Sequence, residues 1–157
     1  MNWWVIIFSL LFLLVLISFY FRLRTFHSLD LVLKSKNWDK LSKKEYLKKC
    51  YDFIGNHFVW KSQCWIYYPW RNFYYRNIWN LKNNCLPCHI QNSIFQHALL
   101  TRFRRKEIKT IFTYDLKQNI FVHFYSKIKL NGKWIDVDIH KKNDGVPFGK
   151  NIHTIKR

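Results

Sequence analysis

The chain has 157 residues and a mass of 19.5 kDa, and its 27 lysines and arginines against nine acidic residues give a formal net charge of +18. This length fits one domain and an anchor segment. Such a charge can serve nucleic-acid binding. The basic residues are spread along the whole chain, however, and no nucleic-acid-binding motif is present, so we do not expect nucleic acid as the partner.

The first predicted element is an apolar helix at the N-terminus. Trp3–Phe21 contains no charged side chain, and as a helix it would be about 28 Å long, enough for the core of a bilayer. Trp3, Trp4 and Tyr20 stand where interfacial aromatic residues are found. A cleaved signal peptide would have a basic start, a shorter apolar run and small residues at the cleavage site. We therefore predict a single-pass membrane anchor over residues 1–22.

The segment that follows the apolar run is basic. Arg22, Arg24 and Lys34 follow it, whereas only the terminal amine precedes it. The positive-inside rule therefore places the remainder of the chain on the cytoplasmic side. We predict residues 23–56 to be a basic juxtamembrane helical segment that contacts anionic lipid headgroups. The alternative interpretation of the same lysines is a solvated helix face.

A capping box predicts one helix within this basic segment. Ser42 and Glu45 have the spacing of the box, and Gly55 can end the helix that it starts. The apolar side of this helix would consist of Leu41, Tyr46, Leu47, Cys50, Phe53 and Ile54.

The next predicted helix begins with a pair of cysteines, Cys85-Leu-Pro-Cys88. Asn83 or Asn84 can cap it, and Pro87 suits its first turn, where the missing N–H costs nothing. Cys88 would then lie among the free N–H groups at the positive end of the helix dipole, where a thiolate is favoured. Residues with helical spacing would bury this helix against a hairpin: Ile90, Ile94, Phe95, Ala98, Leu99 and Phe103.

Asn131-Gly132 predicts the turn of that hairpin, because a two-residue type I′ turn needs a positive φ at both positions. The resulting register sets Lys127 opposite Asp136, as a cross-strand ion pair. It also sets Tyr125 opposite Asp138 and His123 opposite His140, in the part of the hairpin furthest from the turn.

His123 and Asp138 lie on one face of this predicted hairpin, because side chains alternate between the two faces of a strand. As diagonal neighbours their Cβ atoms would be roughly 7 Å apart, a gap that the two side chains can close. A thiol at a helix start, a histidine and an aspartate are the groups that a cysteine nucleophile, its base and the base's orienting residue require. We therefore predict Cys88, His123 and Asp138 as the catalytic residues.

These residues resemble the transglutaminase-like family of papain-like thiol enzymes, in which a cysteine opens a buried helix and strands bearing histidine and aspartate follow. His123-Phe-Tyr and Asn131-Gly-Lys-Trp-Ile-Asp-Val-Asp138 match the family pattern, and the resemblance covers roughly residues 81–149. It implies an α+β domain over residues 57–157, with a Cys-bearing helix packed on an antiparallel sheet. It departs from the family pattern at Ile139, where the family often has proline.

The resemblance implies acyl transfer on amide bonds through a thioester, with a protein or peptide substrate and no cofactor. Cys88 would be the nucleophile, His123 the general base and Asp138 the residue that orients it. The acceptor, water or an amine, decides between a peptidase or amidase and a transglutaminase. Cys85 is a second candidate for the nucleophile.

Three alternatives use the same residues differently. Cys85-Leu-Pro-Cys88-His89 also fits covalent attachment of c-type haem, although the only methionine is Met1, so a second histidine would have to complete the axial ligands. The second alternative is a non-catalytic anchored domain for binding or scaffolding. Zinc binding is a third and weaker alternative, because only Cys85 and Cys88 have ligand-pair spacing among the candidate ligands Cys50, His57, Cys64, Cys85, Cys88 and His89.

Overall fold

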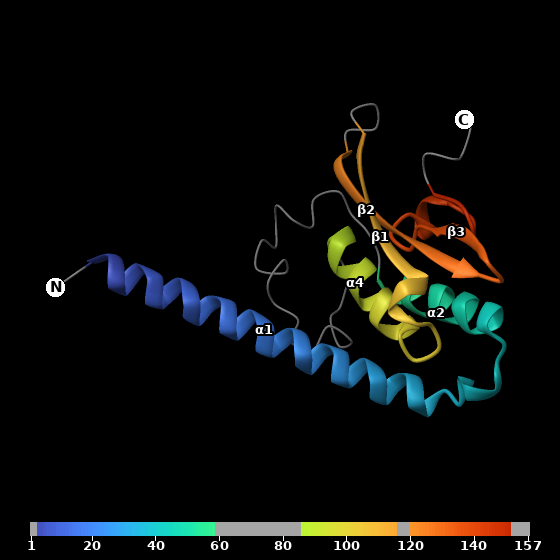
Figure 1. The fold of residues 1–157 in the computed structure, drawn as a ribbon, viewed down its shortest axis with the longest axis horizontal. Coiled ribbons are helices and arrows are strands. Elements are labelled where there is room, and N and C mark those ends of the chain that lie inside the picture. The colour runs from blue at the N-terminus through green and yellow to red at the C-terminus, as the bar shows by residue number, and fades with distance from the viewer. Residues whose placement is uncertain (1–2, 59–85, 116–119, 152–157) are drawn as a thin grey trace.

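The computed structural model describes residues 3–58, 86–115 and 120–151. Its elements are α1 (Trp3–Ser35), α2 (Lys43–His57), α4 (Cys88–Leu99), β1 (Ile108–Asp115), β2 (Ile120–Leu130) and β3 (Lys133–Val137), together with 3₁₀ turns at Trp38–Lys40, Arg105–Glu107 and Lys142–Asp144 (η5). The strands form an antiparallel sheet in the order β1-β2-β3 (Figure 1). The predicted class, helices combined with an antiparallel sheet behind an N-terminal apolar helix, is confirmed at this level.

Helix α1 is longer than the predicted anchor and has two different halves. Its first part projects away from the other elements (Figure 1). Most of its apolar side chains as far as Leu23 are exposed, and Phe21 packs partly against the core. Its last part packs on α4 and buries Thr25, Leu29 and Leu33. The helix is long and apolar enough to cross a membrane, a property that a signal sequence in this position would share.

Helix α2 begins as predicted and ends later than predicted. Ser42 and Glu45 form both hydrogen bonds of the capping box. Gly55 does not end the helix, which continues to His57, because Gly55 has a packing role instead. A Cβ atom at Gly55 would lie 2.5 Å from Cδ of Lys142, and the ammonium group of Lys142 is held by the carbonyl of Asp52 at 3.2 Å.

The predicted boundary at residue 57 does not separate two packing units. Residues of α1, α2, α4 and the sheet share one core: Leu29, Leu33, Leu47, Cys50, Ile54, Ile90, Ile94, Phe95, Leu99, Ile128, Val137 and Ile139 belong to it. The Tyr46 hydroxyl of α2 donates to the carbonyl of Ala98 at 2.9 Å. The basic segment that was predicted as juxtamembrane is therefore part of the domain, because its apolar side covers α4.

The hairpin forms with the predicted turn and register. Asn131 and Gly132 have φ values of 50° and 81°, as a type I′ turn requires. Lys127 pairs with Asp136, and their charged groups are 3.6 Å apart, which confirms the predicted cross-strand ion pair. Strand β1, which sequence reasoning did not predict, pairs with the other edge of β2.

The predicted pairing stops short of the residues of the site. Strand β3 ends at Val137, so the expected ladder partners Tyr125–Asp138 and His123–His140 do not form as strand pairs. The chain turns at this point because the Oδ1 atom of Asp138 accepts a hydrogen bond from the backbone N–H of Lys141 at 3.2 Å, and η5 follows.

Candidate active site

Cys88 is the first residue of α4. Pro87 precedes it with φ −58° and ψ 151° and acts as the N-cap, one position earlier than the predicted place in the first turn. The Pro87 carbonyl accepts from the N–H groups of Ile90 and Gln91 at 3.1 and 3.0 Å. The N–H groups of Cys88 and His89 precede the first intrahelical bonds, so the thiol lies at the positive end of the dipole as expected. The predicted caps Asn83 and Asn84 are outside the described residues.

The predicted stripe of apolar residues fixes this helix in the core. Ile90, Ile94, Phe95, Ala98 and Leu99 are all fully buried. Phe103 is also buried, although it lies beyond the end of α4. Burial of five such side chains favours one position of the helix over the sheet, since each contributes about 1.5–3 kcal/mol relative to exposure, with less for Ala98.

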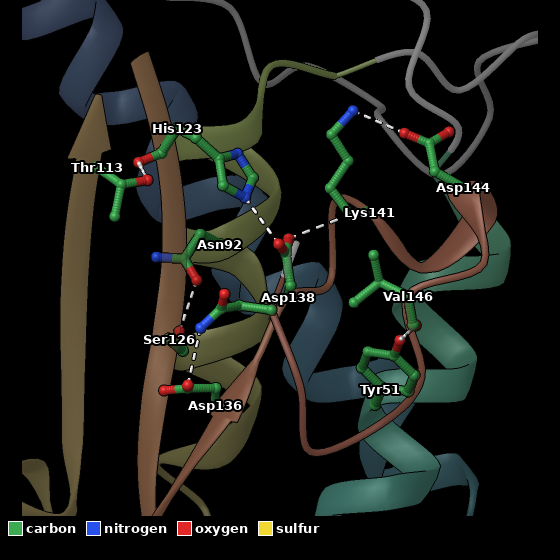
Figure 2. Close-up of polar contacts among 11 residues, drawn as sticks. Tyr51, Asn92, Thr113, His123, Ser126, Asp136, Asp138, Lys141, Asp144 and Val146 are labelled. Atoms are coloured by element: carbon green, nitrogen blue, oxygen red, sulfur yellow. Dashed lines mark hydrogen bonds and ion pairs between the residues drawn. The ribbon is translucent and has the colours of Figure 1, made fainter. Parts of the chain in front are cut away.

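Polar side chains that sequence reasoning missed connect α4 to β2. The Ser126 hydroxyl donates to Oδ1 of buried Asn92 at 2.5 Å and accepts from Nε2 of Gln96 at 2.9 Å. Figure 2 shows Asn92 on α4 facing Ser126 on β2. The i, i+4 spacing of Asn92 and Gln96 places both on one helix face, which is a signal that the sequence contained. Because buried polar groups need partners, these bonds fix the register of helix and strand.

His123 and Asp138 meet at the edge of the sheet. The Nε2 atom of His123 lies 2.8 Å from Oδ2 of Asp138, and the two side chains are 1% and 0% exposed. Figure 2 shows the imidazole of β2 and the carboxylate after β3 pointing toward each other. The predicted contact between these two residues is confirmed. The carboxylate cannot turn away easily, because its other oxygen accepts from the Lys141 N–H.

The side chains of Cys88 and His123 lie close enough for each to shift the pKa of the other. Burial alone would raise the pKa of Cys88, but hydrogen bonds from His123, His89 and the backbone N–H of Phe124, and the charge of His123, lower this pKa to about 6. Since Nε2 of His123 faces Asp138, Nδ1 is the ring nitrogen that can exchange a proton with the sulfur. The structure thus brings together all three predicted residues.

The pKa of His123 is raised, whereas that of Cys88 is lowered. Burial lowers the pKa of its imidazole, but the hydrogen bond and charge of Asp138 and those of Cys88 outweigh burial and raise the pKa to about 9. Between about pH 6 and about pH 9, the preferred form is therefore a thiolate beside an imidazolium. This is the reactive form of a cysteine nucleophile.

Two further rings surround the imidazole of His123. The His140 ring is buried and its centroid lies 5.5 Å from that of His123, and the Tyr125 ring is stacked at 6.3 Å. Burial, His123 and Lys141 lower the pKa of His140 well below its usual value, so His140 is neutral at pH 7. The charge on His123 is therefore stabilised by Asp138 and Cys88 and not by His140.

The alternative ligand sets are only partly within the described residues. Cys85 and Cys64 lie outside them, so the haem motif and the larger zinc set are not described. His89 is exposed, and its ring centroid is 6.1 Å from that of Phe124. Within the described ranges, no group of three or more histidine, cysteine, aspartate or glutamate side chains could hold a metal ion.

Comparison of the chain with protein-family models, curated proteins and solved structures found no match. The chemistry of the site is therefore inferred from the chain's own residues and their geometry.

Proposed function

We propose that this protein catalyses thiol-dependent acyl transfer on amide bonds, with Cys88 as nucleophile, His123 as general acid and base, and Asp138 as the orienting residue. The observation that carries this proposal is the buried pair of His123 and Asp138, with Nε2 and Oδ2 2.8 Å apart, beside a Cys88 thiol whose pKa His123 lowers. A transglutaminase-like fold accounts for the same arrangement, since the Cys-bearing helix packs on the strand that carries His123. A protein or peptide side chain or backbone amide is the substrate class.

In the first half of the reaction, the Cys88 thiolate attacks the carbonyl carbon of the amide and forms a tetrahedral oxyanion. The imidazolium of His123 then donates its proton to the nitrogen of the leaving amine as the C–N bond breaks. The products are a thioester on Cys88, a free amine and a neutral imidazole. The backbone N–H of Cys88, which has no acceptor within the helix, is available to stabilise the oxyanion.

In the second half, the neutral imidazole of His123 takes a proton from the acceptor, which is water or a primary amine. The acceptor attacks the thioester carbonyl, and Cys88 leaves as a thiolate. This restores the thiolate–imidazolium pair. Asp138 holds the ring in one tautomer and stabilises its positive charge in both halves.

The experiment that tests this proposal is a burst assay with the full chain in detergent and p-nitrophenyl acetate, an activated ester. We expect release of about one equivalent of p-nitrophenol from the parent protein, because acylation of Cys88 precedes slower deacylation. Cys88→Ser should abolish the burst and Cys85→Ser should retain it. The reverse pattern would assign the nucleophile to Cys85, and a Soret absorption band from the purified protein would support haem attachment instead.

The acceptor is tested separately, with a glutamine-containing protein and a fluorescent primary amine. Incorporation of the amine that depends on Cys88 identifies a transglutaminase-type reaction. Release of ammonia or new peptide termini without incorporation identifies hydrolysis. Neither product, together with a Cys88 that reacts no faster than an ordinary thiol, would favour a non-catalytic binding domain.

We also propose that α1 crosses a membrane once through Trp3–Phe21 and that the domain lies on the cytoplasmic side. The support is the apolar part of α1, most of whose side chains are exposed, and the arginines that follow it. Intact mass measurement of the protein from membranes should find residues 1–22 retained. In sealed vesicles with the cytoplasmic side inside, added protease should leave the domain intact, and digestion there would reverse the orientation.

A further inference from the structure

A cavity lies between α1, α4 and the start of β1, at the point where the apolar part of α1 ends. Its volume is about 380 Å³, which is within the range of small-molecule sites. Arg22 and Arg105 are among the residues that line it. Among its described lining residues, none carries a carboxylate. The cavity therefore offers positive charge without a built-in counter-ion.

The two arginines differ in how firmly they are held. The Arg22 guanidinium donates to the hydroxyl of Ser93 at 3.3 Å and lies over the ring of Phe26 at 5.4 Å. These contacts position it at the cavity and leave most of its five donors unused. Arg105 is exposed, and its guanidinium makes no hydrogen bond or ion pair with the described part of the chain. Arg105 is thus free to turn toward a ligand.

A histidine that lines the cavity is paired with a carboxylate of α1. His97 lines the cavity, and its Nε2 atom lies 3.1 Å from Oδ1 of Asp30 on α1. The ring of His97 also stacks on Phe26 with centroids 4.2 Å apart. These contacts join α1 to α4, and the guanidinium groups of Arg22 and Arg105 are the permanent positive charges of the described lining.

Apolar side chains also line the cavity. Phe26, Leu100 and Ile108 line it, and Leu100 is 47% exposed. A free inorganic anion would gain nothing from such a wall, whereas the glycerol and upper acyl chain of a lipid would cover it. The position of the cavity agrees with this, because Arg22 directly follows the apolar run Trp3–Phe21 and so would lie at headgroup depth.

We infer that this cavity binds the phosphodiester headgroup of an anionic phospholipid, with Arg22 and Arg105 contacting the phosphate and Phe26, Leu100 and Ile108 contacting the apolar part. This inference rests on the membrane anchoring proposed above and is independent of the chemistry at Cys88. Bound lipid would tie α4, which carries the nucleophile, to the membrane surface.

The test is native mass spectrometry of the full chain in detergent, titrated with phosphatidylglycerol and, in parallel, with phosphatidylcholine. Arg22→Gln combined with Arg105→Gln should weaken binding of phosphatidylglycerol about tenfold or more, since each basic residue near a membrane surface contributes about 1 kcal/mol. Arg24→Gln with Lys106→Gln is the matched control. It removes the same charge from neighbouring exposed positions outside the cavity and should change binding less than about threefold.

An equal loss of binding in both double variants would overturn the proposal, because charge alone would then explain it. So would phosphatidylcholine that binds as tightly as phosphatidylglycerol, or millimolar inorganic phosphate that displaces the lipid. Arg105→Glu alone serves as a second variant, because Arg105 is exposed and its replacement breaks no described contact. It should weaken the lipid adduct as well.

Two controls separate this proposal from the function proposed above. Resistance to alkaline carbonate extraction reports the membrane anchor, and the rate of Cys88 alkylation reports the active site. Both should be the same in the Arg22/Arg105 double variant as in the parent. If the parent chain is anchored and reactive but the double variant binds phosphatidylglycerol normally, only the inference about the cavity fails.

Discussion

Cys50 and Cys88 are two free cysteines on neighbouring helices, and the pKa values of their thiols are shifted in opposite directions. Cys50 lies in the middle of α2 with an exposure of 0%, and burial raises its pKa to about 12 against a smaller opposite effect of a hydrogen bond with Tyr46. At Cys88 burial is also the largest single influence, yet its partners together lower the pKa to about 6. Burial therefore does not decide the state of a thiol here.

The difference lies in what each sulfur contacts. Cys50 meets apolar side chains and one phenol, which cannot stabilise a negative charge well. Cys88 meets an imidazole, a backbone N–H and the start of a helix, and each of these favours the thiolate. The cation at His123 depends in turn on Asp138. Reactivity at Cys88 is therefore a property of the neighbouring strand and turn as much as of the cysteine.

The largest expected effect is the contrast in alkylation between these two thiols. At pH 7 about nine tenths of Cys88 and roughly one hundred-thousandth of Cys50 would be thiolate, given pKa values of about 6 and about 12. We expect iodoacetamide to modify Cys88 at least a thousandfold faster than Cys50. Site-resolved mass spectrometry of the full chain at timed intervals measures this ratio.

A free cysteine peptide is the external reference for the same measurement. A low pKa also lowers intrinsic nucleophilicity, so the advantage of Cys88 over the peptide should be only a few-fold at pH 7 and about tenfold at pH 6, where the peptide is almost wholly protonated. Equal rates for Cys88 and the peptide at pH 6 would contradict the thiolate–imidazolium pair.

Replacement of His123 should remove most of this contrast. In His123→Gln the burial of Cys88 is no longer opposed by an imidazolium, so the pKa of Cys88 should rise from about 6 to well above neutrality. The rate of alkylation at pH 7 should fall about a hundredfold, and its midpoint in a pH series should move upward. His89→Gln is the matched control, since His89 also bonds the thiol but is exposed. A larger effect of His89→Gln would reverse the two roles.

Asp138→Asn should give a smaller change of the same kind. The amide keeps the shape of the carboxylate and removes its charge, so the pKa of His123 should fall from about 9 and the pKa of Cys88 should rise. We expect about a tenfold lower alkylation rate at pH 7. Asp136→Asn is the control, because Asp136 pairs with half-exposed Lys127 at 3.6 Å and has no contact with the imidazole. Its alkylation profile should match that of the parent.

The same two variants should also differ in how their free energy of unfolding changes with pH, which denaturation at several pH values can measure. The pKa of His123 is raised in the folded state, so its contribution to stability is complete below about pH 6.5 and is lost as pH rises through about 9. Asp138→Asn should therefore lose more stability at pH 6 than at pH 10. Asp136→Asn should show no such trend between these pH values.

Local patterns predicted several parts of this site, because they depend on residues close in sequence. The Asn131-Gly132 turn fixed the register that pairs Lys127 with Asp136, and the apolar stripe from Ile90 identified the buried face of α4. The contact of His123 with Asp138 was predicted from a ladder that does not extend so far. It forms nevertheless, because the turn after Val137 keeps the carboxylate beside the imidazole.

Features that depend on distant parts of the chain were missed or misplaced. Gly55 was predicted to end α2, since nothing local indicates that Lys142 would pack on it. The last part of α1 was assigned to a juxtamembrane segment, because only the folded chain shows Leu29 and Leu33 against α4. Strand β1 was not predicted, although Ile108, Thr110 and Phe112 have the residue types of a strand.

The smallest effect on the reactivity of Cys88 is expected from replacement of Cys50. Cys50→Ala removes a fully buried sulfur from the core and should lower the free energy of unfolding by about 1–2 kcal/mol, as measured by denaturant titration. The alkylation rate of Cys88 and its dependence on pH should not change, because Cys50 is not among the groups that shift the pKa of Cys88. Cys88→Ala should behave in the opposite way, with loss of all acylation and a smaller change in stability, since Cys88 is only partly buried. A Cys50→Ala variant that folds normally but alkylates slowly at Cys88 would mean that packing of α2, rather than the contacts of His123, controls the reactive thiol.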